Sequence, residues 1–198
     1  MMMRLRWIVL TFLGLAVAAC AQPPVPQDRY YRINVPPVEA GTPVFKGVLE
    51  LDRLAAEGLT SGRAIVYSDE SSPGLVQEYF YDYWVEPPNV MVRDALIGYL
   101  RKAGIAEAVV SPEVRADADY TLAGRIDRME LVRGAEPKGV VDIELAITNA
   151  RTGKLVMINS YALGVAASDN TVPAGVVAID QGVAAIFERF LDDLKASR

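Results

Sequence analysis

The sequence predicts an α+β domain in two layers: a mixed, mainly antiparallel sheet with two principal helices packed on one face. Three observations support this expectation. Several segments alternate apolar and polar side chains with the period of two that a half-buried strand requires. Two other segments repeat apolar residues with helical spacing. A turn sequence between the last two strand candidates indicates a hairpin.

The first half of the chain contains four strand candidates. Residues 29–34 form the first, and the prolines at 36 and 37 end it. Residues 48–54 and 64–68 are apolar, and residues 76–85 are rich in the aromatic side chains that strands favour. We therefore expect extended structure to precede the first helix.

The first helix is expected directly after these strands. Pro87 and Pro88 stand where it begins, since proline is tolerated in a first helical turn. Gly104 supplies a stop, and residues 106–111 form a further short strand candidate. The apolar residues of the segment keep helical spacing: Val90, Leu96, Ile97 and Leu100.

Three longer strands are expected in the second half of the chain. In residues 120–126 the apolar side chains occupy even positions, but further on they move to Met129 and Leu131. Such a one-residue change of phase predicts a β-bulge. The next strand alternates with polar residues, its apolar positions being Val141, Ile143, Leu145 and Ile147. Residues 150–153 are typical of a hairpin turn into a strand over residues 155–165.

The last expected element is a helix from about residue 173 to residue 195. Its apolar stripe consists of Val176, Ile179, Val183, Ile186, Phe187, Phe190, Leu191 and Leu194. Packing against the sheet is the expected role of this stripe. A helix lying on a membrane is the alternative, but the acidic residues of the segment suit an anionic surface poorly: Asp180, Glu188, Asp192 and Asp193.

The N-terminus has the marks of a secretory signal peptide over residues 1–19. Arg4 and Arg6 precede a short apolar stretch, and small residues stand directly before Cys20. The apolar stretch is too short for a bilayer span, which takes roughly 20 residues. Because Val-Ala-Ala-Cys resembles the lipobox of bacterial lipoproteins, we expect lipid attachment at Cys20. Cleavage by signal peptidase I, which would leave a free thiol there, is the alternative.

Residues 20–28 are expected to be the lipidated cysteine and a proline-rich tether. The prolines favour an extended conformation, so the segment can hold a folded body away from the lipid headgroups. Ala21 follows Cys20, in place of the aspartate that commonly retains enterobacterial lipoproteins in the inner membrane, which favours the outer membrane. Residues 29–198 are expected to form a single domain, lipid-anchored and facing the periplasm.

Composition excludes several classes of function. Removing Arg4 and Arg6 with the signal peptide leaves 18 of the 20 basic residues against 25 acidic ones, a formal net charge of −7, which argues against nucleic acid binding. The chain has no histidine, so it lacks a Ser-His-Asp triad and a histidine metal site. The carboxylate pairs Asp142 with Glu144 and Asp192 with Asp193 are expected on solvated surface. We expect no catalysis, no metal and no cofactor.

Aromatic residues are concentrated between positions 79 and 84. In a regular strand Tyr79, Tyr81 and Tyr83 share one face, while Phe80 and Trp84 share the other. One face can fill the core. The tyrosine face is a possible partner surface, because tyrosine anchors protein interfaces well; a purely internal role and contact with lipid are the alternatives. We expect Trp84 to be buried at the junction of sheet and helix.

An ordered set of motifs is similar to the ABC-type transport auxiliary lipoproteins, the PqiC-like family. The matching residues are Ile65-Val66-Tyr67-Ser68, Ser72-Pro73-Gly74-Leu75, then Tyr79, Tyr83, Trp84, Glu86, Pro87 and Pro88. Further matches are Tyr30-Tyr31, Leu96 and Leu100, Ala118-Asp119-Tyr120-Thr121-Leu122 and Thr152-Gly153-Lys154-Leu155. The resemblance covers about residues 28–195, and of the chemically defined sites it transfers only Cys20.

The resemblance implies a non-enzymatic accessory of an MCE-type lipid transport system. In such systems an ABC permease and ATPase lie in the inner membrane, and an MCE-domain protein lies in the periplasm. The auxiliary lipoprotein meets the MCE assembly at the outer membrane, in some members as a ring-shaped homo-oligomer. Two other functions stay open: a periplasmic lipid carrier with its own acyl-chain cavity, and a regulatory lipoprotein of cell-wall or lipopolysaccharide assembly.

Overall fold

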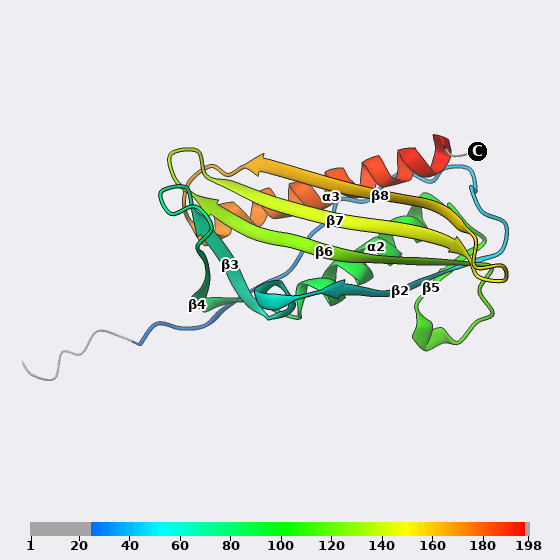
Figure 1. The fold of residues 1–198 in the computed structure, drawn as a ribbon, viewed down its shortest axis with the longest axis horizontal. Coiled ribbons are helices and arrows are strands. Elements are labelled where there is room, and N and C mark those ends of the chain that lie inside the picture. Colours follow the sequence, from blue (N-terminus) through cyan, green and yellow to red (C-terminus); the bar gives the residue numbers. More distant parts are fainter. Residues whose placement is uncertain (1–24, 197–198) are drawn as a thin grey trace, which may run out of the picture.

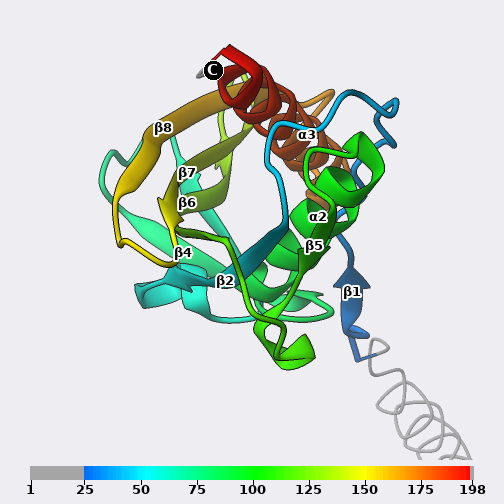
Figure 2. The ribbon, with the colours of Figure 1, turned by 90° about the vertical axis from the view of Figure 1, so that its right-hand side faces the viewer.

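The computed structural model describes residues 25–196, so Cys20 and the expected signal peptide lie outside the described residues. The described chain forms two layers. An eight-stranded sheet makes one layer, and the helices α2 and α3 lie together on one of its faces (Figure 1, Figure 2). The predicted α+β class and the placement of both helices on one face are confirmed.

The elements follow one another in an order close to the predicted one. The strands are β1 (Arg29–Tyr31), β2 (Val48–Ala56), β3 (Ala64–Asp69), β4 (Val76–Trp84), β5 (Ala108–Val110), β6 (Tyr120–Arg133), β7 (Lys138–Asn149) and β8 (Leu155–Ala166). The helices are α2 (Pro88–Ala103) and α3 (Val172–Ala196), with short 3₁₀ turns at Gly58–Ser61 and Pro112–Val114. Each predicted helix and strand is therefore present, with boundaries shifted by a few residues.

β6 is the strand around which the sheet is built. One of its edges pairs in parallel first with β2, from Tyr120 to Ile126, and then with β3, from Glu130 to Arg133. Its other edge pairs with β7 in antiparallel register, and this register shifts between Ile126 and Arg128. The predicted β-bulge is thus confirmed. Because a bulge bends its strand, β6 changes direction where its neighbour changes from β2 to β3.

The turn between β7 and β8 forms the predicted hairpin. The two strands pair from Lys138 opposite Ala166 to Thr148 opposite Leu155. Gly153 has the left-handed conformation, φ 68°, that favours glycine, and its N–H donates to the carbonyl of Asn149 at 2.8 Å. In the described part of the chain, the other edge of β8 pairs with no strand.

Both helices bury their apolar stripes against the sheet. α2 packs on β2 and β5, and α3 on β6, β7 and β8. The expected role of the α3 stripe in the core is confirmed, since Ile179, Val183 and Phe187 are all 0% exposed. Gly139 of β7 lets α3 approach closely, because a Cβ there would lie 2.7 Å from the backbone nitrogen of Ile179. Among the described residues, the helices are too short or too polar to cross a bilayer.

The first strand is shorter than predicted. β1 ends at Tyr31, so the expectation of a strand to residue 34 is wrong. The physical reason lies in its partner: Tyr31 pairs with Trp84, the last residue of β4, beyond which the chain turns into α2. The segment after β1 leaves the sheet and lies against α2 and α3, where the backbone N–H of Asn34 donates to Asp180 at 3.1 Å.

Trp84 lies where β4 ends and the turn into α2 begins. Its side chain is 1% exposed, and its backbone N–H donates to the carbonyl of Arg63 at 2.7 Å. The predicted burial of Trp84 at the junction of sheet and helix is confirmed.

Candidate docking site at the tether junction and the helix-free sheet face

The segment that follows the expected tether is fixed to the body by a buried carboxylate. Asp82 of β4 is 3% exposed, and its two oxygens accept hydrogen bonds from one edge of the Arg29 guanidinium, at 2.7 Å from Nε and 2.8 Å from Nη2. The hydroxyl of Tyr31 donates to the same carboxylate at 2.9 Å. A bidentate arginine and a phenol are the kind of partners that a buried carboxylate requires.

The electrostatics of this cluster match its geometry. The hydrogen bond to Asp82 and the charge of Asp82 raise the pKa of Arg29. Burial, followed by the hydrogen bond to Asp82, raises the pKa of Tyr31. Because β1 also pairs in parallel with β4, from Arg29 opposite Asp82 to Tyr31 opposite Trp84, the backbone and the side chains hold the same register. We call this cluster of Arg29, Tyr31 and Asp82 the tether junction.

An irregularity in β4 displaces the aromatic residues beside this junction. Ala64 of β3 pairs with Tyr83 and Val66 pairs with Glu78, so β4 carries extra residues between these two pairs. The side chain of Phe80 is 83% exposed and that of Tyr81 is 43% exposed. The regular alternation assumed from the sequence is interrupted here, and Phe80 does not follow Trp84 into the core.

The three tyrosines of the predicted partner surface lie in different environments. Tyr79 is half-buried with its ring 4.4 Å from that of Tyr67. Tyr83 is also half-buried; its ring stacks on Tyr30 at 5.8 Å, and its hydroxyl donates to the carbonyl of Phe80 at 2.7 Å. Only Tyr81 of the three is exposed, so a partner at this surface would meet Tyr81 together with Phe80, which the sequence pattern did not single out.

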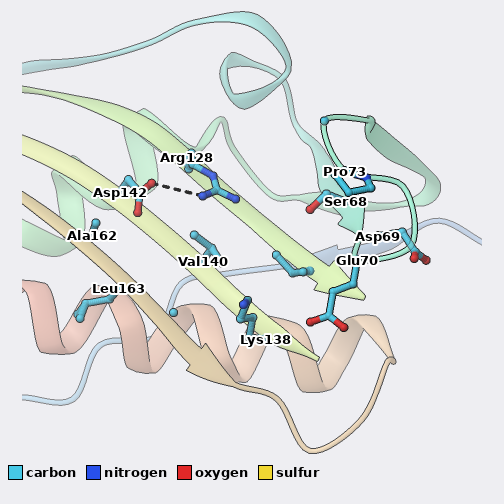
Figure 3. A pocket seen from close by; sticks show the side chains of 13 residues that line it. Ser68, Asp69, Glu70, Pro73, Arg128, Lys138, Val140, Asp142, Ala162 and Leu163 are labelled. Carbon is cyan, nitrogen blue, oxygen red and sulfur yellow. Dashed lines mark ion pairs between the residues drawn. The ribbon is translucent and has the colours of Figure 1, made fainter. Parts of the chain in front are cut away.

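A cleft of about 540 Å³ opens on the sheet face that the helices leave uncovered. Figure 3 shows α3 behind the strands and the turn between β3 and β4 beside the cleft. Charged side chains from both sides line it, Glu70 from the turn and Arg128, Lys138 and Asp142 from β6 and β7. Val132 and Val140 give it an apolar floor, being 9% and 7% exposed.

Arg128 joins two acids along one side of this cleft. It forms an ion pair with Asp142 at 3.8 Å (Figure 3) and another with Glu130, outside the lining, at 2.5 Å. Glu130 is 7% exposed and also accepts a hydrogen bond from Ser68 at 3.2 Å, which links β6 to β3. Burial raises the pKa of Asp142, and the charge of Arg128 partly opposes that shift. The cleft therefore presents fixed charges of both signs around an apolar floor.

The paired carboxylates noted in the sequence have structural partners. Asp142 pairs with Arg128, and Glu144 accepts from Ser160 at 3.3 Å. Asp193 is half-buried and accepts from Tyr161 at 2.7 Å and from Asn159 at 2.8 Å, so it is not the solvated surface residue that we expected. Within residues 25–196, acidic groups do not gather in threes as a metal centre would need.

A second cleft, of about 650 Å³, lies between the segment after β1 and the helices. Tyr99 of α2 and Asp180 and Glu188 of α3 line it together with Asn34 and Pro36. Burial raises the pKa of Asp180 to about 6, although the hydrogen bond from the N–H of Asn34 opposes the shift. Asp180 thus holds the N-terminal segment across the two helices.

The fold places the chain in a class known from solved bacterial structures. A protein of the DUF330 family from Xanthomonas campestris superposes with a TM-score of 0.72 at 17% identity, over 82% of this chain and 92% of that one. An uncharacterized protein superposes with a TM-score of 0.67 at 15% identity, over 85% and 99%. At these identities the likeness shows a common α+β fold.

The family model for ABC-type transport auxiliary lipoprotein components matches residues 21–189. The chain therefore belongs to this family, and the resemblance noted in its motifs is confirmed. Comparison with curated protein sequences finds no match. The PelC dodecamer from Paraburkholderia phytofirmans has a TM-score of 0.44 at 13% identity, over 76% of this chain and 91% of that one, too low to carry an argument about assembly.

Proposed function

We propose that this lipoprotein is a non-enzymatic component of an MCE-type ABC transport system for lipids. Acyl chains on Cys20 anchor it in the outer membrane, facing the periplasm. Its body docks or stabilises the periplasmic MCE assembly and, through it, an inner-membrane permease and ATPase. The family match supports an auxiliary role in ABC transport, and the proposal adds the anchor, the membrane and the partner.

The observation that carries this proposal is the tether junction. A lipid-anchored protein can hold a partner at a fixed place relative to the membrane only if its tether is firmly joined to its body. The bidentate contact between Arg29 and Asp82 and the pairing of β1 with β4 supply such a joint at the first residues of the body.

The partner contact is proposed for the helix-free face of the sheet. This face combines the apolar floor of Val132 and Val140 with charges of both signs, and it lies beside the edge of β8 that pairs with no strand within residues 25–196. Apolar centres with charged rims are common in specific protein interfaces. An extended segment of a partner can also add to a free strand edge through backbone hydrogen bonds.

Site-specific photo-crosslinking in cells tests the function and the face together. A photoreactive residue at Ala162, which is exposed and lines the cleft, should capture an MCE-domain protein. The matched control is Val177, which is 54% exposed on the outward side of α3 and should capture much less. Capture of only cell-wall synthases or lipopolysaccharide-assembly proteins would reject the transport function, and equal capture from both positions would reject the face.

The packing of the interior disfavours the lipid-carrier alternative. Between the sheet and the helices the space is filled by side chains such as Leu49, Leu122 and Phe190, all 0% exposed. Charged side chains line both clefts described above. An acyl chain, in contrast, needs an apolar channel. Mass spectrometry of the purified body should therefore find no phospholipid bound within the fold.

A further inference from the structure

We propose that the projection formed by Phe80 and Tyr81 inserts into the lipid surface to which the chain is tethered. This contact would fix the orientation of the body on the membrane. The inference rests on the proposed lipid anchor at Cys20. Three features meet at one end of the molecule to support it: exposed aromatic side chains, arginine side chains and the strand β1, which the proposed tether enters.

Exposed aromatic side chains lie on the paired strands β4 and β1. Tyr30 of β1 is 55% exposed and stacks on Tyr83, whose hydroxyl donates to the carbonyl of Phe80. Leu75 and Val76, at the start of β4, are 52% and 41% exposed. Single exposed apolar residues need no explanation, but a group of them on neighbouring strands marks an interaction site. The extra residues in β4 push Phe80 outward, away from the core.

The position of the tether selects a lipid surface as the occupant. Residues 20–28 alone separate the proposed anchor from Arg29, and at full extension they reach about 30 Å. β1, which the tether enters, pairs directly with the end of β4 that carries this projection. Figure 1 shows β4 and the N-terminal segment at one end of the long axis, and the C-terminus at the other.

The opposite end of the body lies much further from the anchor. β8 has 12 residues and runs from Leu155, at the end remote from the tether, to Ala166. At about 3.3 Å per residue it spans about 40 Å, more than the whole reach of the tether. An end-on orientation, with the β4 projection toward the lipid, therefore leaves the turn between β7 and β8 facing away from the membrane.

Arginines beside the projection suit the phosphate layer of a membrane. The Arg29 side chain is 58% exposed and has further N–H donors beyond the two that Asp82 occupies. The guanidinium of Arg63 lies 5.5 Å from the centre of the Tyr30 ring. Two exposed acids offset these arginines: Glu78 lies in β4 and Asp28 directly before β1. The net charge of this surface is therefore small. Aromatic insertion, more than attraction to anionic lipid, would hold the contact.

Fluorescence quenching in vesicles tests the contact on the full lipoprotein. Cys20 is the only cysteine of the chain, and acylation would block its thiol, so a Phe80→Cys variant offers a single site for the environment-sensitive dye NBD. The matched control is Ile158→Cys, on the outer face of β8 at the remote end, where the side chain is 49% exposed. Both positions are exposed, so neither change disturbs the core. The vesicles contain phosphatidylethanolamine, phosphatidylglycerol and a phospholipid with a shallow nitroxide label.

The expected result is loss and blue shift of NBD emission at position 80, with emission at position 158 unchanged. The same loss is expected when phosphatidylglycerol is left out and the nitroxide-labelled phospholipid is kept in otherwise zwitterionic vesicles. Equal emission at both positions, or loss at both, would overturn the end-on contact. Capture of an MCE-domain protein from a photoreactive residue at position 80, without quenching, would assign the surface to a protein instead. Flotation with vesicles and the intact mass of the protein test the lipid anchor separately. A chain that does not float with vesicles would lack the lipid on which both proposals depend.

Discussion

The carboxylate of Asp82 accepts two hydrogen bonds from the guanidinium of Arg29, across 53 residues of sequence. This contact joins β1, which follows the expected tether, to β4, the neighbouring strand that carries the exposed aromatics. The first strand of the body is therefore held to the sheet by side chains as well as by backbone pairing. The tether junction should therefore hold β1 on the sheet.

Replacing Asp82 with alanine should free β1 from the sheet. The change leaves Arg29 and Tyr31 without their common acceptor, and we expect the free energy of unfolding to fall by about 1–2 kcal/mol. Amide hydrogen exchange should show lost protection in β1 and at the end of β4. Glu78→Ala, on the exposed part of the same strand, is the control. Equal amide hydrogen exchange in the two variants would show that Asp82 does not hold β1 on the sheet.

The titration of Asp180 should make the free energy of unfolding depend on pH. Its folded pKa, about 6, lies above the ordinary value of about 4, so the fold favours the protonated form. The free energy of unfolding should fall as pH rises from about 4 to about 6, and then level off. Asp180→Asn keeps an acceptor for the N–H of Asn34 and should remove this slope, gaining about 1 kcal/mol at pH 7 once solvent screening is allowed for. Denaturant titration at several pH values measures it, and an unchanged slope in the variant would contradict the assignment.

A single methyl group at Gly139 should disturb the contact between β7 and α3. The added Cβ would lie 2.7 Å from the backbone nitrogen of Ile179, and the helix backbone cannot move away without shifting its buried stripe. We expect Gly139→Ala to lower stability by about 1–3 kcal/mol. Gly164→Ala on the neighbouring strand is the control, since its nearest contact would be an ordinary 3.6 Å to Lys138. Similar melting temperatures for the two variants would be inconsistent with this packing.

Trp84 offers an optical test of the junction between sheet and helix. Trp7 leaves with the expected signal peptide, so Trp84 becomes the only tryptophan of the mature chain. Because its side chain is 1% exposed, the emission should be blue-shifted and resist quenching by acrylamide. Red-shifted, readily quenched emission would show that β4 and α2 do not pack as described.

The sequence revealed the irregularity in β6 but not the one in β4, and the reason is physical. In β6 the apolar residues move from even to odd positions after Ile126. The shift in register can therefore be recognised in the sequence. In β4 three of the four residues between the two pairs are aromatic, like the residues that follow them. Phe80 and Trp84 have the same parity and are both aromatic, yet one is 83% and the other 1% exposed.

The candidate site was equally hard to predict, because its parts are distant in sequence. An isolated acid such as Asp82 within an aromatic run is typical of an exposed position. Its burial depends on Arg29, which only the pairing of β1 with β4 brings near. The cleft on the helix-free face likewise combines a turn after β3 with strands from the second half of the chain. Local patterns gave the elements, whereas these contacts follow from the sheet order.

Cell fractionation of a Cys20→Ser variant, with crosslinked recovery of partners, tests the central claim most directly. The account predicts that the wild-type chain sediments with the outer membrane and recovers an MCE-domain protein. The variant should be found folded in the periplasm, recover far less of that protein and no longer support transport. A Cys20→Ser protein that stays on the membrane and fully supports transport would contradict the anchored docking role.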